Sequence, residues 1–244
     1  MIYRYFRCPD HVSDVISTRR LYFANPRKFN DPLESVVMFD RQRDSNGDTK
    51  PLDAIQYAGK PIEGLGICCF SRTVDNYLLW SHYADSHKGV CLGFDFGRYF
   101  TKGYDVGDAQ LLQYDNTAIY FTDVHYEPAF FELPYWDDKN SGDWSLGADE
   151  AIQVYAHKLK GWHYELEIRA IVVSLKDPFI SFPPSALQEI AFGATCPQTV
   201  REFLLQAVRS QANRIQPFEM QLDPKGNGLK RIAIPLHNRD TGGA

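Results

Sequence analysis

The sequence predicts an α+β fold in which strands outnumber helices. Segments with the alternating, β-branched and aromatic character of strands recur along the chain, and regular crossover helices do not separate them. Of the 244 residues, 44% are hydrophobic and 14% are aromatic, which is enough to build a substantial core. We therefore expect two packed, mostly antiparallel β-sheets that form a cleft, with helices at the flanks.

Local patterns place the elements of the first hundred residues. Val12, Val15 and Ile16 share one helical face, and Asp10 precedes them as a candidate N-cap. Pro32 biases Asp31 away from helical geometry, so the segment around it is expected to be irregular. We expect strands at residues 2–6, 21–26, 66–70 and 89–96, and helices at residues 9–20 and 74–86.

The second half continues with strands and two helices. We expect strands at residues 117–127, 162–173, 187–193, 217–223 and 229–236, and helices at residues 148–160 and 196–214. Residues 103–150 hold eleven acidic side chains against the single base Lys139. The predicted organisation is one domain over residues 1–236, with an acidic, aromatic-rich insertion at 103–146 and a flexible tail at 237–244.

Charge and cysteine content narrow the class of protein. The net charge of -5 argues against a protein that coats nucleic acid. The first 28 residues carry a formal charge of +4, which suits either phosphate binding or a solvated helix face. The five cysteines, an odd number, and the lack of a signal-peptide pattern predict a cytoplasmic protein with reduced thiols and no membrane partner.

The strongest candidate for a catalytic site is a pair of glutamates at positions 165 and 167. Glu165 and Glu167 are two residues apart, so in a strand they would point to the same face. Two such carboxylates side by side are expected to raise the apparent pKa of the pair. The alternative is an exposed strand face on which Glu167 and Arg169 are simple charge partners.

Other polar residues give weaker signals. His82, Asp85 and His87 do not have the spacing of a metal site, so we predict no metal ligands and assign the histidines to capping or core roles. Ser71 lacks the G-x-S-x-G setting of a hydrolase nucleophile and is expected to cap the turn that follows it. The sequence has no glycine-rich phosphate loop.

Longer blocks give the chain a family resemblance. The segments LYFANPRKFNDPLE, CFSRTVDNYLLWSHYADSHKGVCLGFDF and WHYELEIR resemble a bacterial family catalogued as domain of unknown function 2971. With the first-strand motif YRY, the resemblance extends over almost the whole chain. The name of this family implies no function.

A more distant resemblance does imply one. The order of elements resembles the ADP-ribosyltransferase fold, in particular the diphtheria-toxin-like branch with its His–Tyr–Glu signature. In that signature Arg4 or Tyr5 would stand at the histidine position, Cys69 or Phe70 at the tyrosine position and Glu167 at the catalytic glutamate. Glu165 would position an acceptor or tune Glu167.

The resemblance implies NAD-dependent ADP-ribosyl transfer or NAD glycohydrolysis, as in a toxin or a phage-defence effector. NAD would be the substrate, the acceptor a nucleic acid, a protein or water, and an antitoxin or immunity protein a partner. Together with Glu165 or Glu167, one common cavity would be lined by Arg4, Tyr5, Tyr22, Asn30, Asp31, Phe70, Ser71, Trp80 and His82.

Two other functions are compatible with the sequence. One is a non-catalytic module that binds a nucleotide or nucleic acid, and the other is a metal-dependent nuclease built on the two glutamates and histidines. The paired glutamates favour the transferase over the binding module. The lack of a compact set of Asp, Glu and His ligands disfavours the nuclease.

Overall fold

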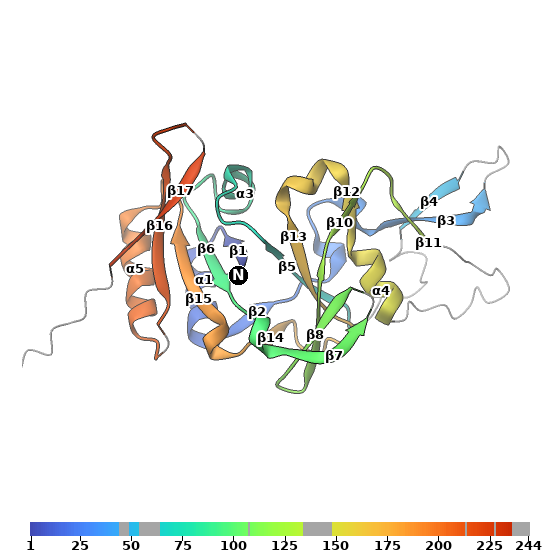
Figure 1. The fold of residues 1–244 in the computed structure, drawn as a ribbon, viewed down its shortest axis with the longest axis horizontal. Helices are drawn as coiled ribbons and strands as arrows, with labels where there is room; N and C mark the ends of the chain where they lie inside the picture. The colour runs from blue at the N-terminus through green and yellow to red at the C-terminus, as the bar shows by residue number, and fades with distance from the viewer. Residues whose placement is uncertain are drawn as a thin grey trace, which may run out of the picture. The chain divides into compact units, whose positions relative to one another are not determined.

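The computed structural model divides the chain into two compact units (Figure 1). It describes residues 1–43, 49–53, 64–106, 108–133, 148–212, 214–226 and 228–235. Unit 1 consists of Met1–Arg20, Ser71–Arg98 and Ser181–Ala244, and unit 2 consists of Leu21–Phe70 and Tyr99–Ile180. The segments β2 (Arg20–Tyr22), β5 (Gly66–Ser71) and β14 (Phe179–Ser181) lie at the boundaries.

Unit 1 is built on strands in the order β17-β16-β15-β6-β1. In chain order its elements are β1 (Ile2–Phe6), α1 (Pro9–Thr18), α3 (Tyr77–Tyr83), β6 (Val90–Phe94), η6 (Pro184–Ala186), β15 (Leu187–Phe192), α5 (Gln198–Arg209), β16 (Gln216–Leu222) and β17 (Leu229–Ala233). The pairs are antiparallel except β15–β16, which is parallel. The 3-10 turn η3 (Gly97–Tyr99) follows at the boundary with unit 2.

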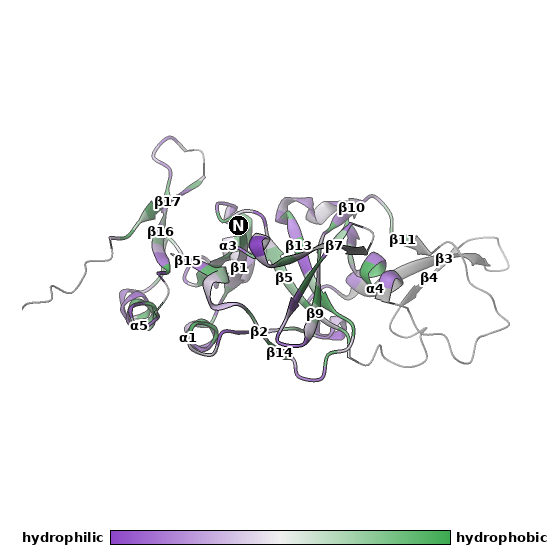
Figure 2. Cartoon of the chain, turned by 60° about the horizontal axis from the view of Figure 1, so that its bottom comes forward, coloured by the Kyte–Doolittle hydropathy of each residue, from purple (hydrophilic) through white to green (hydrophobic). Residues whose placement is uncertain are grey.

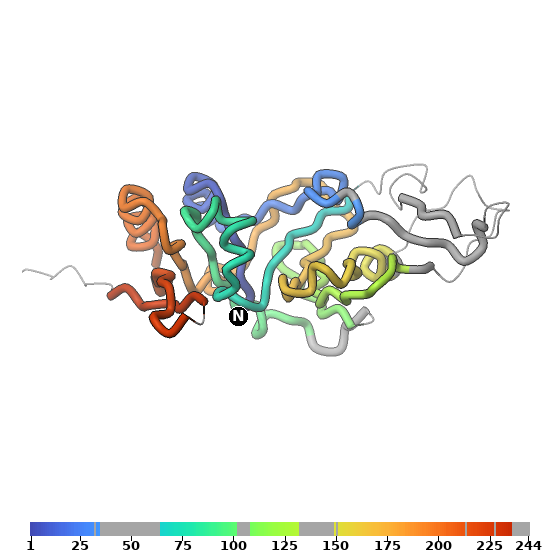
Figure 3. The backbone as a smooth tube through the Cα atoms, turned by 90° about the horizontal axis from the view of Figure 1, so that it is seen from above, coloured from blue at the N-terminus to red at the C-terminus, as the bar shows by residue number. Residues whose placement is uncertain are grey.

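The register of these strands gives unit 1 two apolar faces. Tyr3 lies opposite Gly93, and Cys91 lies opposite Ala191, so these positions share one face, where Trp80 of α3 joins the same core cluster. The helices α1 and α5 lie side by side along these strands (Figures 2 and 3). Their buried residues recur at helical spacing: Val12, Val15 and Ile16 in α1, and Leu204 and Val208 in α5.

Unit 2 has a main set of strands in the order β5-β13-β9-β8-β7. Besides β5, its elements are η1 (Pro26–Lys28), η2 (Pro32–Ser35), β3 (Val36–Arg43), β4 (Thr49–Asp53), β7 (Phe100–Val106), β8 (Ala109–Tyr114), β9 (Thr117–Asp123), β10 (His125–Glu127), β11 (Phe131–Leu133), α4 (Ala148–Tyr155), β12 (His157–Leu159), η5 (Lys160–Glu165) and β13 (Glu167–Val172). β10 and β12 form a parallel pair, and β11, β3 and β4 form a small sheet. Ile152 and Tyr155 of α4 pack with Ile67 of β5 and Ile171 of β13 in the core.

The α+β class is confirmed, whereas several element boundaries were wrong. The expected helix 148–160 ends at Tyr155 and continues as the strand β12, because residues 157–159 pair with β10. The expected strand 117–127 divides into β9 and β10, which belong to different sheets. The helix expected at 74–86 is the shorter α3, and Asn76 is its N-cap.

The N-cap predicted for the first helix was also wrong. Cys8, not Asp10, occupies that position, and its side chain makes no capping hydrogen bond. Pro9 at the first helical position fixes the helical φ angle without a side-chain cap. The capping role of Ser71 is confirmed, because its Oγ accepts a hydrogen bond from the backbone N–H of Thr73 at 3.2 Å.

The predicted domain organisation stays a prediction. Within the stretch expected to be an insertion, β7, β8 and β9 are strands of the main set of unit 2. The predicted tail at 237–244 lies outside the described residues. Among the helices that the structure describes, none is both long enough and apolar enough to span a membrane.

Candidate functional site

The residues predicted to form one cavity are divided between the two units. Unit 1 contains Arg4, Tyr5, Ser71, Trp80 and His82, and unit 2 contains Tyr22, Asn30, Asp31, Phe70, Glu165 and Glu167.

In unit 1 the predicted aromatic residues are part of the core. The side chain of Trp80 is fully buried, and its Nε1 donates a hydrogen bond to the carbonyl of Val74 at 2.7 Å. Tyr5 packs edge-on against Trp80, with 5.2 Å between the ring centroids, and its hydroxyl donates to the carbonyl of Thr73 at 2.9 Å. Together with the cap made by Ser71, these contacts fix the connection from β5 to α3.

The other two residues of the unit 1 set lie nearer the surface. The guanidinium of Arg4 lies 5.5 Å from the centroid of the Phe6 ring. His82 is exposed, and its backbone carbonyl accepts a hydrogen bond from Arg7. Nearby, the side chain of Asn76 accepts a hydrogen bond from the backbone N–H of Leu78 at 2.9 Å as the cap of α3.

In unit 2, Asn30 and Asp31 lie in the irregular segment just before η2, and Phe70 is buried. The Oδ1 atom of Asp31 accepts a hydrogen bond from the backbone N–H of Leu33 at 2.9 Å, while Asn30 is exposed. Tyr22 packs against the ring of Phe179. The Phe70 ring has 3% of its surface exposed, too little to stack on a ligand in this conformation.

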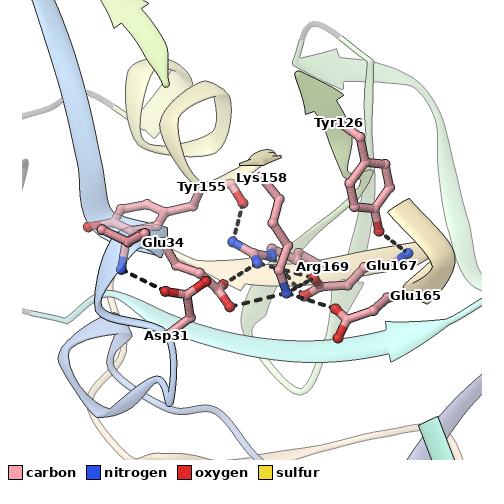
Figure 4. A network of polar contacts seen from close by, with 9 residues as sticks. Asp31, Glu34, Tyr126, Tyr155, Lys158, Glu165, Glu167 and Arg169 are labelled. Carbon is pink, nitrogen blue, oxygen red and sulfur yellow. Dashed lines mark hydrogen bonds and ion pairs between the residues drawn. The ribbon is translucent and has the colours of Figure 1, made fainter. Parts of the chain in front are cut away.

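Glu165 and Glu167 meet three further residues in a buried group of charges that we call the charged cluster: Glu34, Lys158, Glu165, Glu167 and Arg169 (Figure 4). Three carboxylates converge on the ammonium group of Lys158. The distances from Nζ are 3.1 Å to Oε1 of Glu34, 2.7 Å to Oε2 of Glu165 and 3.1 Å to Oε2 of Glu167.

Arg169 forms the second centre of the charged cluster. Its Nε donates to Oε1 of Glu167 at 2.8 Å, and its Nη2 donates to Oε2 of Glu167 at 3.1 Å and to Glu34. Its Nη1 donates to the carbonyl of Tyr155 at 2.9 Å. The backbone N–H of Glu167 donates to the hydroxyl of Tyr126 at 2.8 Å (Figure 4). Arg169 is fully buried, so this planar, bidentate pairing replaces the water that it loses.

Four short elements deliver the members of the charged cluster. Glu34 comes from η2, Lys158 from the centre of β12, Glu165 from the end of η5, and Glu167 and Arg169 from one face of β13. The prediction that Glu165 and Glu167 share a strand face was wrong. Glu165 ends a 3-10 helix, and Leu166 has a left-handed backbone with φ of 45°, so a bend brings the two carboxylates to the same lysine.

The electrostatics of the charged cluster are opposite to those expected for two isolated carboxylates. Burial disfavours the Glu167 carboxylate, but the positive charges of Arg169 and Lys158 outweigh it and lower the pKa of Glu167 to about 2. Burial likewise disfavours the charged form of Lys158, but Glu167, Glu34 and Glu165 raise its pKa above the ordinary value. The expectation of a raised pKa was therefore wrong for Glu167, because Lys158 and Arg169 lie beside it.

The alternative to a catalytic role was that Glu167 and Arg169 are charge partners on an exposed strand face. The pairing is confirmed, but the face is buried, since Glu167 has 5% of its surface exposed. With three carboxylates and two cations, the charged cluster has a formal charge of -1. A buried surplus of negative charge favours a cation, or a transition state that develops positive charge, beside it.

A small hollow in unit 2 borders the charged cluster. Among the residues that line it are Asp31, Glu34, Lys158, His157 and Phe131. Its interior has room for about one water molecule. The His157 ring stacks on Phe131 with 4.1 Å between centroids, and burial lowers the pKa of His157, so the ring is neutral at pH 7. Asp31, which was predicted as a site residue, therefore lies beside the same hollow as Glu34.

Sequence reasoning missed Glu34 and Lys158. Glu34 ends the block FNDPLE, whose Asn30 and Asp31 were selected instead, and Lys158 lies in the segment 148–160 that was expected to be a helix. A lysine two residues into a short strand is a weak signal without its tertiary partners. In the part of the chain that the structure describes, no group of three or more His, Cys, Asp or Glu side chains is placed to hold a metal ion. The ammonium of Lys158 stands at the point where the three carboxylates meet.

Comparison with known protein families matches part of the chain. The model of a family described as "Protein of unknown function (DUF2971)" matches residues 79–170, which is less than half of the chain. This region contains α3 from Leu79 onwards and four of the five residues of the charged cluster. No curated protein sequence matches the chain, and no solved structure matches it.

Proposed function

We propose that the chain cleaves the bond between nicotinamide and ribose in NAD and transfers ADP-ribose to an acceptor, which is a nucleic acid, a protein or water. The observation that carries this proposal is the buried surplus of carboxylates in the charged cluster. When the glycosidic bond breaks, its electron pair leaves with nicotinamide and the ribose becomes an oxocarbenium-like cation. Carboxylates beside that cation lower the energy of the transition state, as they do in glycoside hydrolysis.

Within the charged cluster, we assign the ribose-facing role to Glu165. Glu34 and Glu167 each contact both Lys158 and Arg169, and we propose that they hold these two cations in place. Glu165 contacts Lys158 from the end of η5, next to the bend at Leu166. Glu167, the residue preferred from sequence, then acts as a positioning residue that holds Lys158 and Arg169.

The reaction also requires a cleft and an acceptor. We propose an ADP-ribosyltransferase-like site within unit 2, in which the hollow beside Glu34 and Lys158 widens to admit the nicotinamide ribose. The acceptor gives up one proton when its oxygen or nitrogen attacks the ribose. A toxin or phage-defence effector of this kind would act in the cytoplasm and require an antitoxin or immunity partner.

The direct test is release of nicotinamide from NAD carrying a label in the nicotinamide ring. The wild-type chain should release label, and Glu165→Gln should release it about 10²–10³-fold more slowly, the loss typical of one electrostatic stabiliser. Glu127→Gln is the matched control, because Glu127 is an exposed glutamate of β10 in the same unit. Equal rates in the wild type and Glu165→Gln would refute the assignment.

The second candidate is a non-catalytic nucleotide-binding module. It is favoured by the burial of every member of the charged cluster, since buried, ion-paired carboxylates suit a structural role better than a catalytic one. Titration calorimetry with NAD distinguishes the two functions. Binding without nicotinamide release supports the module, whereas binding with release supports the transferase.

A further inference from the structure

A second pair of reactive side chains lies in unit 1, independent of the NAD chemistry proposed for unit 2. The Oγ of Ser81, on α3, lies 3.1 Å from Nε2 of His87, just after the helix. Ser81 is exposed and His87 is partly buried. A serine hydroxyl within hydrogen-bond distance of an imidazole is the basic arrangement of an activated nucleophile.

The backbone that carries His87 has an uncommon conformation. Asp85, Ser86 and His87 have φ angles of 45°, 51° and 68°, so three consecutive residues other than glycine are left-handed. Residues with a Cβ are strained in the left-handed backbone conformation. This strain persists only where surrounding contacts impose it. Strain of this kind is concentrated at functional sites.

The contacts that impose the conformation are present. The N–H of His87 donates to the carbonyl of Trp80 at 3.1 Å, and its carbonyl accepts from the N–H of Thr195 at 3.1 Å. A Cβ on Gly193 would lie 2.1 Å from the carbonyl oxygen of His87, so only glycine permits this approach. The backbone of His87 is therefore held at both its N–H and its carbonyl.

The protonation state suits a base. Burial lowers the pKa of His87, so the ring is neutral at pH 7. A neutral imidazole with its proton on Nδ1 has a lone pair on Nε2, the atom that faces the Ser81 hydroxyl. Ser81 and His87 both lie within the family-matched residues 79–170.

We propose that Ser81 and His87 form a nucleophile and general-base pair that acts on small acyl esters. The Ser81 Oγ attacks the acyl carbon while its proton passes to Nε2 of His87. The alcohol leaves with the electron pair of the ester C–O bond and takes that proton, which gives an acyl-serine. Water then attacks the acyl-serine, gives its proton to His87, and the proton returns to Ser81 as the carboxylic acid is released.

The test is covalent labelling of the full chain with a fluorophosphonate, followed by intact mass measurement and peptide mapping. Labelling forms a bond from Ser81 Oγ to phosphorus, releases fluoride and passes the hydroxyl proton to His87. We expect one label per chain, located on Ser81. Ser81→Ala should take up none, and Ser86→Ala, which removes another exposed serine of the same turn, should label like the wild type.

His87→Asn separates catalysis from a structural role. Asparagine tolerates a left-handed backbone and can hydrogen-bond to Ser81, but it cannot accept the proton. We expect an unchanged melting temperature, labelling slower by at least about 10²-fold, and the same loss in hydrolysis of p-nitrophenyl acetate. Labelling of His87→Asn at the wild-type rate, or no label on Ser81 in the folded wild type, would overturn the proposal.

Discussion

At the scale of single residues, the Glu167 carboxylate accepts more hydrogen bonds from cationic side chains than the local sequence indicates. Both of its carboxylate oxygens accept hydrogen bonds, Oε1 from Arg169 and Oε2 from Arg169 and Lys158. Removing one member of a buried ion-paired group leaves its partners charged, buried and incompletely paired. Loss of the Glu167 charge should therefore weaken folding.

We therefore predict that Glu167→Gln is strongly destabilising. The free energy of unfolding should fall by roughly 3–5 kcal/mol, the cost of breaking a buried ion pair from one side. Urea denaturation followed by circular dichroism measures this change. Glu127→Gln, at an exposed position of the same unit, should change it by less than about 0.5 kcal/mol. Equal midpoints for the two variants would contradict the proposed network.

The pH dependence of stability follows from the same contacts. The pKa of Glu167 is lower in the folded chain than the ordinary value of about 4.3 expected in the unfolded chain. Its contribution is therefore complete above about pH 5 and is lost as the pH falls towards 2. We predict that the urea midpoint of the wild type falls over this range and that the midpoint of Glu167→Gln falls less. Parallel curves for the two proteins would show that Glu167 is not held by its cations.

Lys158→Met should reverse the sign of the pH dependence of stability. Without the ammonium, three buried carboxylates face Arg169 alone, so at least one of them should take up a proton more readily. Stability should fall by roughly 3–5 kcal/mol at pH 7 and should recover in part as the pH falls from 7 to 5. Lys160→Met, at an exposed position two residues later, is the control and should show neither effect.

At the scale of elements, the sequence was informative where local patterns decide the structure. The apolar spacing of Val12, Val15 and Ile16 correctly predicted α1, because tertiary contacts and local pattern agree there. The segment around Glu165 was predicted as a strand because its alternation continues into β13. The left-handed Leu166 interrupts that strand, and no glycine or proline marks the position in the sequence.

The turn after α3 packs closely against Gly193. Gly193→Ala would place a Cβ 2.1 Å from the carbonyl oxygen of His87, so the two segments must separate. We expect a loss of roughly 2–4 kcal/mol in the free energy of unfolding, in the range of severe steric changes. Gly161→Ala is the control, since a Cβ at Gly161 meets nothing within 4 Å. Thermal unfolding of both variants measures the difference, and a Gly193→Ala variant as stable as the control would contradict the described packing.

At the scale of the whole molecule, the order of strand-like and helix-like segments correctly predicted the α+β class but did not predict the charged cluster. Its members lie between residues 34 and 169, on four elements whose approach depends on tertiary structure. Glu165, Glu167 and Asp31 could be selected from sequence because unusual local patterns surround them. Glu34 and Lys158 could not, because each is an ordinary charged residue until the fold places them together.

The central claim is that the charged cluster of unit 2 is a reaction centre and not only a set of ion pairs. The measurement that tests it most directly is the rate of nicotinamide release by Glu165→Gln, taken with its melting temperature on the same sample. We predict that the chain remains folded at the assay temperature and that release is slower by about 10²–10³-fold than in Glu127→Gln. A folded Glu165→Gln variant that releases nicotinamide at the rate of the control, or a wild-type chain that releases none, would contradict the claim.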